Sequence, residues 1–186
     1  MKVGLFTIGD VDLRHLHRLT AHLEERFFYR FEITANLSAP TSAFNAVKKQ
    51  YFAPAIFNRI KTAFSPDFKY AIGVTHVDLY GISLNYIFGD ANCDEKIALV
   101  STHRLRPEFY GHTPESFLFF DRLLKESMHQ MAHAIGSKHC YNQSCVMHYS
   151  HNIYDIDKKT SLFCSDCEKK LKKTAAFDRA GDSKSA

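Results

Sequence analysis

The sequence lacks the motifs that define several large enzyme classes. It contains no G-x-S-x-G, no G-x-x-x-x-G-K-[ST] and no strand-linked G-x-G-x-x-G, so it carries no nucleophile elbow, no P-loop and no dinucleotide-binding turn. It also lacks any run of about 18 apolar residues, which argues against a transmembrane helix. The apolar run at residues 1–9 is too short and too lightly charged for a signal peptide, so we expect a soluble, cytoplasmic protein without a membrane partner.

A strong net charge is absent as well. The formal charge of +4 is modest for a chain of 186 residues, and we expect no nucleic-acid partner. One basic cluster lies near the C-terminus, and because no aromatic residues interleave it, we interpret it as a solvated helix face: Lys169, Lys170, Lys172 and Lys173. The hydrophobic content of 45%, with 16 Phe, is enough for the core of a single domain.

Metal-ligand residues are abundant in the C-terminal half. Residues 128–140 read M-H-Q-M-A-H-A-I-G-S-K-H-C, which places His129, His133 and His139 around Gly136 in the spacing H-x-x-x-H-x-x-G-x-x-H. Two histidines at i and i+4 share one helix face and can bind one ion. Gly136 can take a positive φ, end the helix and bring His139 in as the third ligand. The pattern predicts a three-histidine zinc site; the alternative is histidines on a solvated helix face.

Position 130 departs from the motif that this spacing otherwise matches. The metzincin motif is H-E-x-x-H-x-x-G-x-x-H followed by a Met-turn, and Gln130 stands at the place of its Glu. In zinc peptidases of this type, that Glu is the general base that takes a proton from the metal-bound water, and an amide cannot do so. Loss of a general base raises the barrier by roughly 3–5 kcal/mol. We therefore expect zinc binding to persist and hydrolysis to be poor, whether Gln130 is a natural departure or an engineered one.

The cysteines follow the histidine motif directly. Cys140 and Cys145 form C-x4-C, Met147 comes two residues later, and Cys164 and Cys167 form C-x2-C. Successive side chains of an extended segment point in opposite directions, so His139 and the residue after it face different ions. The combination H-C-x4-C-x-M followed by C-x2-C resembles the archaemetzincins, a family of zinc metallopeptidase-like proteins, over roughly residues 68–173.

This resemblance implies two zinc ions per chain. The three histidines would hold a catalytic-type zinc, and the four cysteines would close a tetrahedral, structural site. The alternatives are a pair of disulfides or scattered thiols. A structural zinc supplies roughly 10–16 kcal/mol to a short, loop-rich segment, against about 2–4 kcal/mol for a disulfide, which favours metal.

Four nearby residues receive a simpler interpretation. Met147 resembles the methionine of the Met-turn, an apolar floor under the histidine ligands, and its alternative role is ordinary core packing. Cys93 has no spaced partner and is interpreted as a free thiol without a role. His148 and His151 are interpreted as surface residues, because the two predicted sites already have their ligands.

The pattern of apolar residues predicts alternating strands and helices. Strands are expected at residues 3–8, 27–35, 70–75 and 96–101 because these runs are rich in β-branched and aromatic residues. Leu13, Leu16, Leu19 and Leu23 recur at helical spacing. A second helix should start at Pro54, with Ile56, Phe57, Ile60 and Phe64 on its buried side. The zinc helix should run over residues 114–135, capped by Thr113, with five inward apolar residues: Phe117, Phe120, Leu124, Met128 and Met131. A short helix over residues 164–173 and a frayed tail over 178–186 complete the chain.

We therefore predict a mixed α/β fold. By resemblance, it is a metzincin-like, twisted and mixed five-stranded sheet with an antiparallel edge strand, packed on helices, and with a small C-terminal part that four cysteines bind to zinc. Residues 1–139 would form the sheet-and-helix subdomain that ends in the third histidine, and residues 140–186 the Met-turn, the cysteine site, the last helix and the tail. The edge strand is expected from Leu84 to Phe88, where a peptide or protein substrate could pair with it.

Three functional hypotheses follow. The first is a zinc metallopeptidase whose hydrolysis is impaired by Gln130. The second is a zinc-dependent peptide-binding protein that does not hydrolyse its ligand. The third makes the cysteine cluster a nucleic-acid-binding zinc ribbon, which a salt-dependent gel shift would detect.

Overall fold

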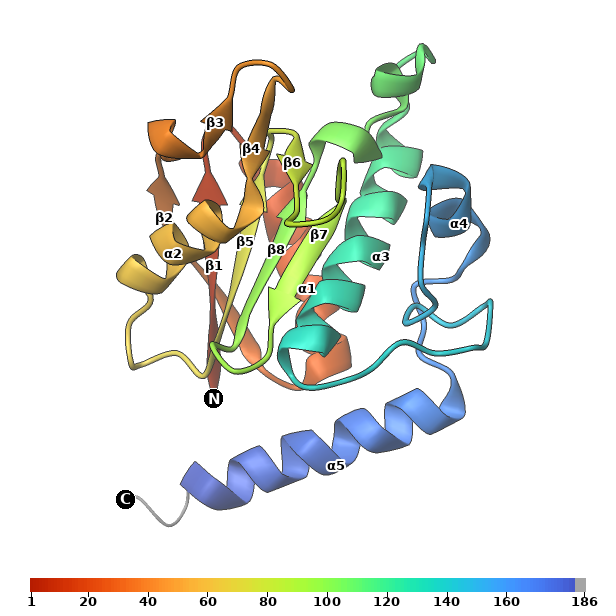
Figure 1. The fold of residues 1–186 in the computed structure, drawn as a ribbon. Coiled ribbons are helices and arrows are strands. Elements are labelled where there is room, and N and C mark those ends of the chain that lie inside the picture. The colour runs from red at the N-terminus through yellow and green to blue at the C-terminus, as the bar shows by residue number, and fades with distance from the viewer. Residues whose placement is uncertain (183–186) are drawn as a thin grey trace.

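A five-stranded mixed sheet forms the centre of the molecule (Figure 1). The computed structural model describes the backbone of residues 1–182 and the side chains through residue 174. The strand order is β2-β1-β5-β8-β7, with β7 antiparallel to β8 and the other pairs parallel. The strands are β1 Lys2–Ile8, β2 Arg30–Leu37, β5 Tyr70–Thr75, β7 Gly89–Asn92 and β8 Ile97–Ser101. The predicted mixed sheet with an antiparallel edge strand is confirmed.

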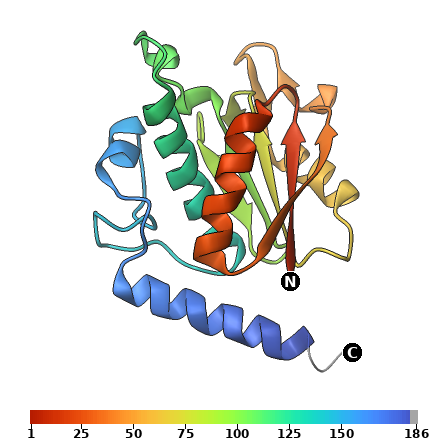
Figure 2. The same cartoon turned by 180° about the vertical axis from the view of Figure 1, so that it is seen from behind.

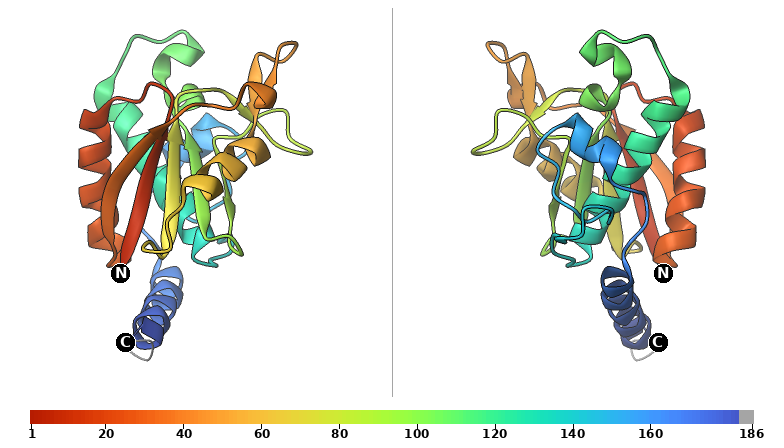
Figure 3. Two further views of the ribbon diagram at one scale, coloured as in Figure 1. Left: turned by 90° about the vertical axis from the view of Figure 1, so that its left-hand side faces the viewer. Right: turned by 90° about the vertical axis from the view of Figure 1, so that its right-hand side faces the viewer.

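Helices cover both faces of this sheet. Helices α1 (Leu13–Phe27) and α3 (Ser116–Ala134) lie side by side on one face (Figure 2). Helix α2 (Ala53–Ala63) covers the opposite face (Figure 3). Two apolar clusters result, one on each face of the sheet. The three inward leucines of α1 are fully buried: Leu16, Leu19 and Leu23.

A second, small sheet was not predicted. Its strands are β3 Phe44–Asn45, β4 Gln50–Phe52 and β6 Leu79–Tyr80, in the order β3-β4-β6. Strands of two or three residues are too short to show an alternating pattern. This sheet lies beside the carboxyl ends of the central strands (Figure 1).

The edge strand lies further along the chain than predicted. Residues 84–88 form no strand apart from one bridge between Ile87 and Leu79, and the edge strand β7 begins at Gly89. The backbone at Gly89 approaches its neighbours so closely that an added Cβ would lie 2.5 Å from the carbonyl oxygen of Leu99. Such an approach is open to glycine alone. The apolar pattern of residues 84–88 therefore reports burial of Ile87 and Phe88 rather than a strand.

The zinc helix also differs from its prediction at its start. Helix α3 begins at Ser116, and the side chain of Glu115 caps it by accepting a hydrogen bond from the Leu118 N–H at 3.0 Å. Thr113 and Pro114 precede the helix, so Thr113 is not its cap. Phe117 in the first turn is 72% exposed instead of buried. The later inward residues Phe120, Met128 and Met131 are buried as predicted, whereas Leu124 is only partly buried.

The C-terminal part contains two further helices, α4 (Ile153–Lys158) and α5 (Ser165–Asp182). Helix α5 is longer than predicted, since good helix formers follow residue 173: Ala175, Ala176, Arg179 and Ala180. Residues 178–182, predicted as a frayed tail, are helical, and 183–186 lie outside the described residues. The four lysines of the basic cluster are exposed, as expected. Among the described residues, no helix has both the length and the apolar character needed to cross a membrane.

A buried ion pair ties α3 to α4. Arg122, which is 5% exposed, donates two hydrogen bonds of 2.7 Å to the carboxylate of Asp157. Replacing Asp157 with Ala should lower the free energy of unfolding by about 3 kcal/mol, because it leaves the Arg122 charge buried and unpaired. Urea unfolding measures this loss. Glu95→Ala, which breaks an exposed pair with Lys61, is the control and should cost less than about 1 kcal/mol; equal losses in the two variants would contradict the prediction.

Candidate metal centre and cleft

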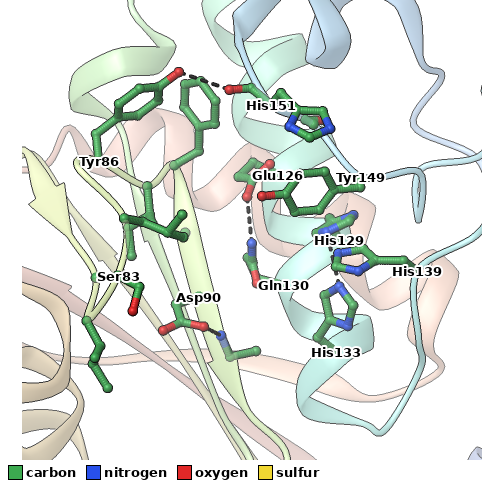
Figure 4. A pocket seen from close by; sticks show the side chains of 18 of the residues that line it. Ser83, Tyr86, Asp90, Glu126, His129, Gln130, His133, His139, Tyr149 and His151 are labelled. Atoms are coloured by element: carbon green, nitrogen blue, oxygen red, sulfur yellow. Dashed lines mark hydrogen bonds between the residues drawn. The ribbon is translucent and has the colours of Figure 1, made fainter.

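Helix α3 and the turn after it bring the three histidines together (Figure 4). His129 and His133 lie one turn apart on α3, with ring centroids separated by 4.6 Å. Gly136 has φ of +102°, as predicted, and the turn there returns the chain toward the helix. The ring of His139 then lies 4.5 Å from that of His133 and 5.3 Å from that of His129. The three potential ligand nitrogens lie within 4.8 Å of one another, close enough to share one ion.

Hydrogen bonds to backbone carbonyls fix which ring nitrogen each helical histidine offers. The Nδ1 of His129 lies 2.8 Å from the carbonyl oxygen of Val146, and the Nδ1 of His133 lies 2.7 Å from that of Ser137. A carbonyl only accepts, so each Nδ1 carries the proton and donates. Each Nε2 is then left with a free lone pair, and the two Nε2 atoms are 3.1 Å apart. This tautomer and this support from carbonyl groups are typical of zinc-ligating histidines.

Burial keeps the histidine rings neutral. Desolvation lowers the pKa of His129 well below its ordinary value of 6.5, and the nearby charge of Lys159 lowers it further. Burial also lowers the pKa of His133 and of His139. A neutral imidazole is the metal-binding form, so near neutral pH the three rings are ready to bind an ion without first losing a proton.

The same shifts predict acid sensitivity. A histidine whose pKa is lower in the folded than in the unfolded chain opposes folding below its unfolded pKa, because the unfolded chain then binds the extra proton. The free energy of unfolding should therefore fall as the pH drops through about 6.5 toward the lower pKa of the folded form. Urea unfolding between about pH 8 and pH 5 measures the trend. His112→Gln, which removes an exposed histidine, should leave the profile unchanged; a flat profile for the parent chain would contradict the prediction.

The four predicted cysteines also converge. Their sulfur atoms lie within 4.8 Å of one another, and the Sγ atoms of Cys140 and Cys164 are 3.8 Å apart. All five cysteines of the chain are free thiols in the structure, so the alternative of two disulfides does not describe it. The backbone N–H of Cys167 lowers the pKa of Cys164 to about 7, whereas burial raises the pKa of Cys145. Four thiols in one small volume, with one easily ionised, fit a closed zinc site.

The methionine and the remaining histidines lie near these sites. Met147 is fully buried, and its carbonyl oxygen accepts a hydrogen bond of 2.9 Å from the backbone N–H of Cys140. His148 is partly buried and donates from Nδ1 to the carbonyl of Cys140 at 3.0 Å, so it is not simply a surface residue. His151 is exposed. Cys93 is exposed and lines the cleft.

A cleft of about 1000 Å³ runs between the edge strand and the histidines. Strand β7 and the segment before it form one wall, and α3 with the segments around His139 and Tyr149 forms the other (Figure 4). The hydroxyl of Tyr86 crosses the cleft and donates to the carbonyl of His151 at 3.0 Å. The ring of Tyr149 packs edge-on against that of His139, with centroids 4.9 Å apart. The histidine site therefore opens onto a groove that can hold an extended ligand.

Gln130 lies on the wall of this cleft, between α3 and β7. Its side-chain Nε2 donates to Oε1 of Glu126 at 2.7 Å, and both residues are buried. A Cβ at Gly89 would lie 2.8 Å from Cγ of Gln130, so glycine leaves the space that this side chain fills. Figure 4 shows the amide nitrogen turned toward Glu126 and the amide oxygen turned away from it.

Two charged residues at the site were missed by the sequence analysis. Glu126 precedes Gln130 by one helical turn, and the spacing i, i+4 on an inward face could have pointed to it. Lys159 is 1% exposed, donates to the carbonyl of His148 at 3.2 Å and lies 3.4 Å from Nδ1 of His129. Burial lowers the pKa of Lys159. No sequence pattern marks it, because nothing in the chain near residue 159 indicates packing against the zinc helix.

A mixed sheet whose edge strand faces a three-histidine helix, across a groove open to an extended ligand, defines the scaffold of a metal-dependent hydrolase. The model of the family described as Peptidase family M54 matches residues 24–173. The chain belongs to this family, the archaemetzincins, whose members are zinc metallopeptidases by name.

Individual relatives agree in sequence and in fold. An archaemetzincin of Pyrococcus furiosus is 40% identical over 176 residues, with 88% of each chain covered. One of Methanocaldococcus jannaschii is 37% identical, covering 92% of this chain and 93% of the relative. The crystal structure of a zinc-dependent peptidase of Methanocorpusculum labreanum matches with a TM-score of 0.83 at 25% identity, over 91% of this chain and 99% of that one. The archaemetzincin of Methanopyrus kandleri matches with a TM-score of 0.81 at 28% identity, over 94% of each chain.

Proposed function

We propose that this protein is a zinc-dependent peptidase that hydrolyses peptide bonds slowly, because Gln130 replaces the general-base Glu. The observation that carries the proposal is the convergence of His129, His133 and His139 on one wall of the cleft, with free Nε2 atoms on the two helical residues. Three histidines are the donor set of catalytic zinc sites that keep a fourth position open. Zinc held there would polarise a peptide carbonyl and lower the pKa of a bound water.

We further propose that the substrate is an extended peptide that pairs with strand β7. The sequence analysis expected the peptide to pair with residues 84–88. We now propose pairing with Gly89–Asn92, because the edge strand lies there. An edge strand offers its outward backbone groups to an added strand. The N–H of Ala91 donates to the Asp90 carboxylate at 2.8 Å, so an arriving peptide would exchange this bond for one of its own. The apolar side chains of Ile87 and Phe88 line the same wall.

The second proposed ion is a structural zinc held by Cys140, Cys145, Cys164 and Cys167. We propose two zincs per chain because the chain has two separate clusters of donors. His139 and Cys140 are neighbours in the sequence, but they belong to different clusters. Free thiols that bind metal are typical of a reducing compartment. This is the basis on which we propose a cytoplasmic location.

A different class of function remains supported by Gln130. An amide cannot accept the proton that hydrolysis releases, so a zinc-dependent peptide-binding protein without turnover would have the same site. The two functions differ in one observable. A peptidase releases new amino termini from a bound peptide, whereas a binding protein retains the intact peptide as long as zinc is present.

Incubation of the zinc-loaded chain with a mixture of unstructured peptides tests the proposal. Mass spectrometry should detect slow cleavage that stops when zinc is chelated. His133→Ala should abolish cleavage and remove one zinc per chain. Cys93→Ser changes an exposed thiol outside the two donor clusters. This control variant should retain both zinc ions. Zinc-dependent binding of intact peptides without any cleavage would favour the binding protein instead.

A further inference from the structure

The cleft contains a buried carboxylate that the metzincin motif does not include. Glu126 is 3% exposed and lines the cleft. Its hydrogen-bond partner is the neutral amide of Gln130, and the salt bridges of the described residues do not include it. Burial of a carboxylate without a cation in contact is costly for the fold. A purely structural role therefore explains Glu126 poorly.

Its position along α3 matches that of the other site residues. Glu126 precedes His129 by three residues, Gln130 by four and His133 by seven, so all four lie on one stripe of the helix. Figure 4 shows the Glu126 carboxylate on the cleft wall, hydrogen-bonded to Gln130. Glu126 and the three histidines line the same cleft. The carboxylate thus borders the space that the three histidines also face.

The hydrogen bond with Gln130 leaves Glu126 able to accept further hydrogen bonds and to take up a proton. A carboxylate has about four lone-pair positions, and the Gln130 amide fills one of them. The amide also holds the carboxylate in place, since a bond of 2.7 Å between two buried side chains fixes both. In the metzincin motif, one Glu supplies the carboxylate charge from the position that follows the first histidine. Here Gln130 occupies that position with a neutral amide, and the carboxylate of Glu126 lies one helical turn before it.

We propose that Glu126 is the general base of this site, in place of the Glu that the motif would have at position 130, and that Gln130 positions it. This inference rests on the proposed peptidase function. The attacking water loses a proton to the Glu126 carboxylate while its oxygen forms a bond to the carbonyl carbon of the peptide. The C–N bond then breaks, and Glu126 returns the proton to the departing amine nitrogen. Glu126 ends the cycle as a carboxylate, and one water has been consumed.

Glu126→Gln tests this role. General-base catalysis contributes about 10²- to 10⁴-fold, so kcat should fall by about 10²-fold or more while KM changes little. Both zincs should remain bound, because no donor atom of either cluster is removed. The melting temperature should stay about equal, since the substitution keeps the size and shape of the side chain beside Gln130. Glu108→Gln, which changes an exposed carboxyl group, is the control and should leave kcat unchanged.

The outcomes separate this inference from the proposed function. Unchanged turnover in Glu126→Gln would overturn the role of Glu126 and leave the peptidase function standing. Loss of turnover in Asp90→Asn but not in Glu126→Gln would assign the proton transfer to the opposite wall of the cleft and would also overturn it. Loss of turnover together with a lower melting temperature or loss of zinc would show a structural role. If the parent chain cleaves no peptide but gains activity when Gln130→Glu is combined with Glu126→Gln, Glu126 is not a base, although the scaffold is a peptidase.

Discussion

Replacing Cys145 with Ser is expected to remove one zinc per chain and to lower the melting temperature by about 10 °C or more. Cys145 is 1% exposed and lies among the four sulfur donors. A structural zinc contributes roughly 10–16 kcal/mol in small zinc-binding units, which is as large as the whole stability of an ordinary domain. The segment between α3 and α5 contains one short helix and otherwise turns and loops, so it has few other means of holding its shape.

Zinc content per chain and differential scanning calorimetry measure this effect. Cys93→Ser is the matched control, because that thiol is exposed and belongs to neither donor cluster; it should keep two zincs and the parent melting temperature. A parent chain that holds no zinc, or a Cys145→Ser variant as stable as the parent, would contradict the structural role of this site.

Combining Glu126→Gln with Gln130→Glu should raise kcat/KM about 10²- to 10⁴-fold above that of Glu126→Gln alone. The double variant moves the carboxylate to the position of the motif Glu and keeps one amide and one carboxylate in contact. Gln130→Glu alone is a poorer test, because it would place a second carboxylate against Glu126 across the present 2.7 Å contact. Two carboxylates at that distance cannot both be ionised, so one of them would take up a proton.

Steady-state hydrolysis of a cleaved peptide, followed at constant zinc, measures the gain. The melting temperature of the double variant should match that of the parent, since the pair is exchanged and not broken, whereas Gln130→Glu alone should melt lower. A double variant that binds zinc and remains as inactive as Glu126→Gln would show that a carboxylate at position 130 cannot serve this site. Activity in the parent chain would then depend on the carboxylate at position 126 specifically.

The parts of the fold that the sequence predicted are those with a strong repeating pattern. The buried leucines of α1 recur at helical spacing, and the strand Tyr70–Thr75 is buried along its whole length. The edge strand was misplaced because its position depends on Gly89, which has no side chain to contribute to any pattern. The start of α3 was misplaced because Thr113 and Glu115 are both able to cap a helix, and tertiary structure selects the second.

The same contrast holds at the site. The histidines and cysteines could be assigned from spacing alone, because a metal shell restricts the residues that can form it. Glu126 and Lys159 were not assigned, since a charged residue is ordinarily assumed to face water. Their burial depends on which segments pack against α3, and that packing is decided by long-range contacts. The chemistry beyond the metal ligands was therefore visible only in three dimensions.

The adjacency of His139 and Cys140 links the two proposed metal sites. A single planar peptide unit joins the two proposed coordination shells. An ion that fixes the four cysteines would therefore also fix the position of the His139 ring. On the proposed assignment, a newly made chain would acquire its structural ion first and its reactive ion afterwards. When zinc is scarce, the chain would then lack its structural ion, and the histidine site would stay unformed whatever its own affinity for zinc.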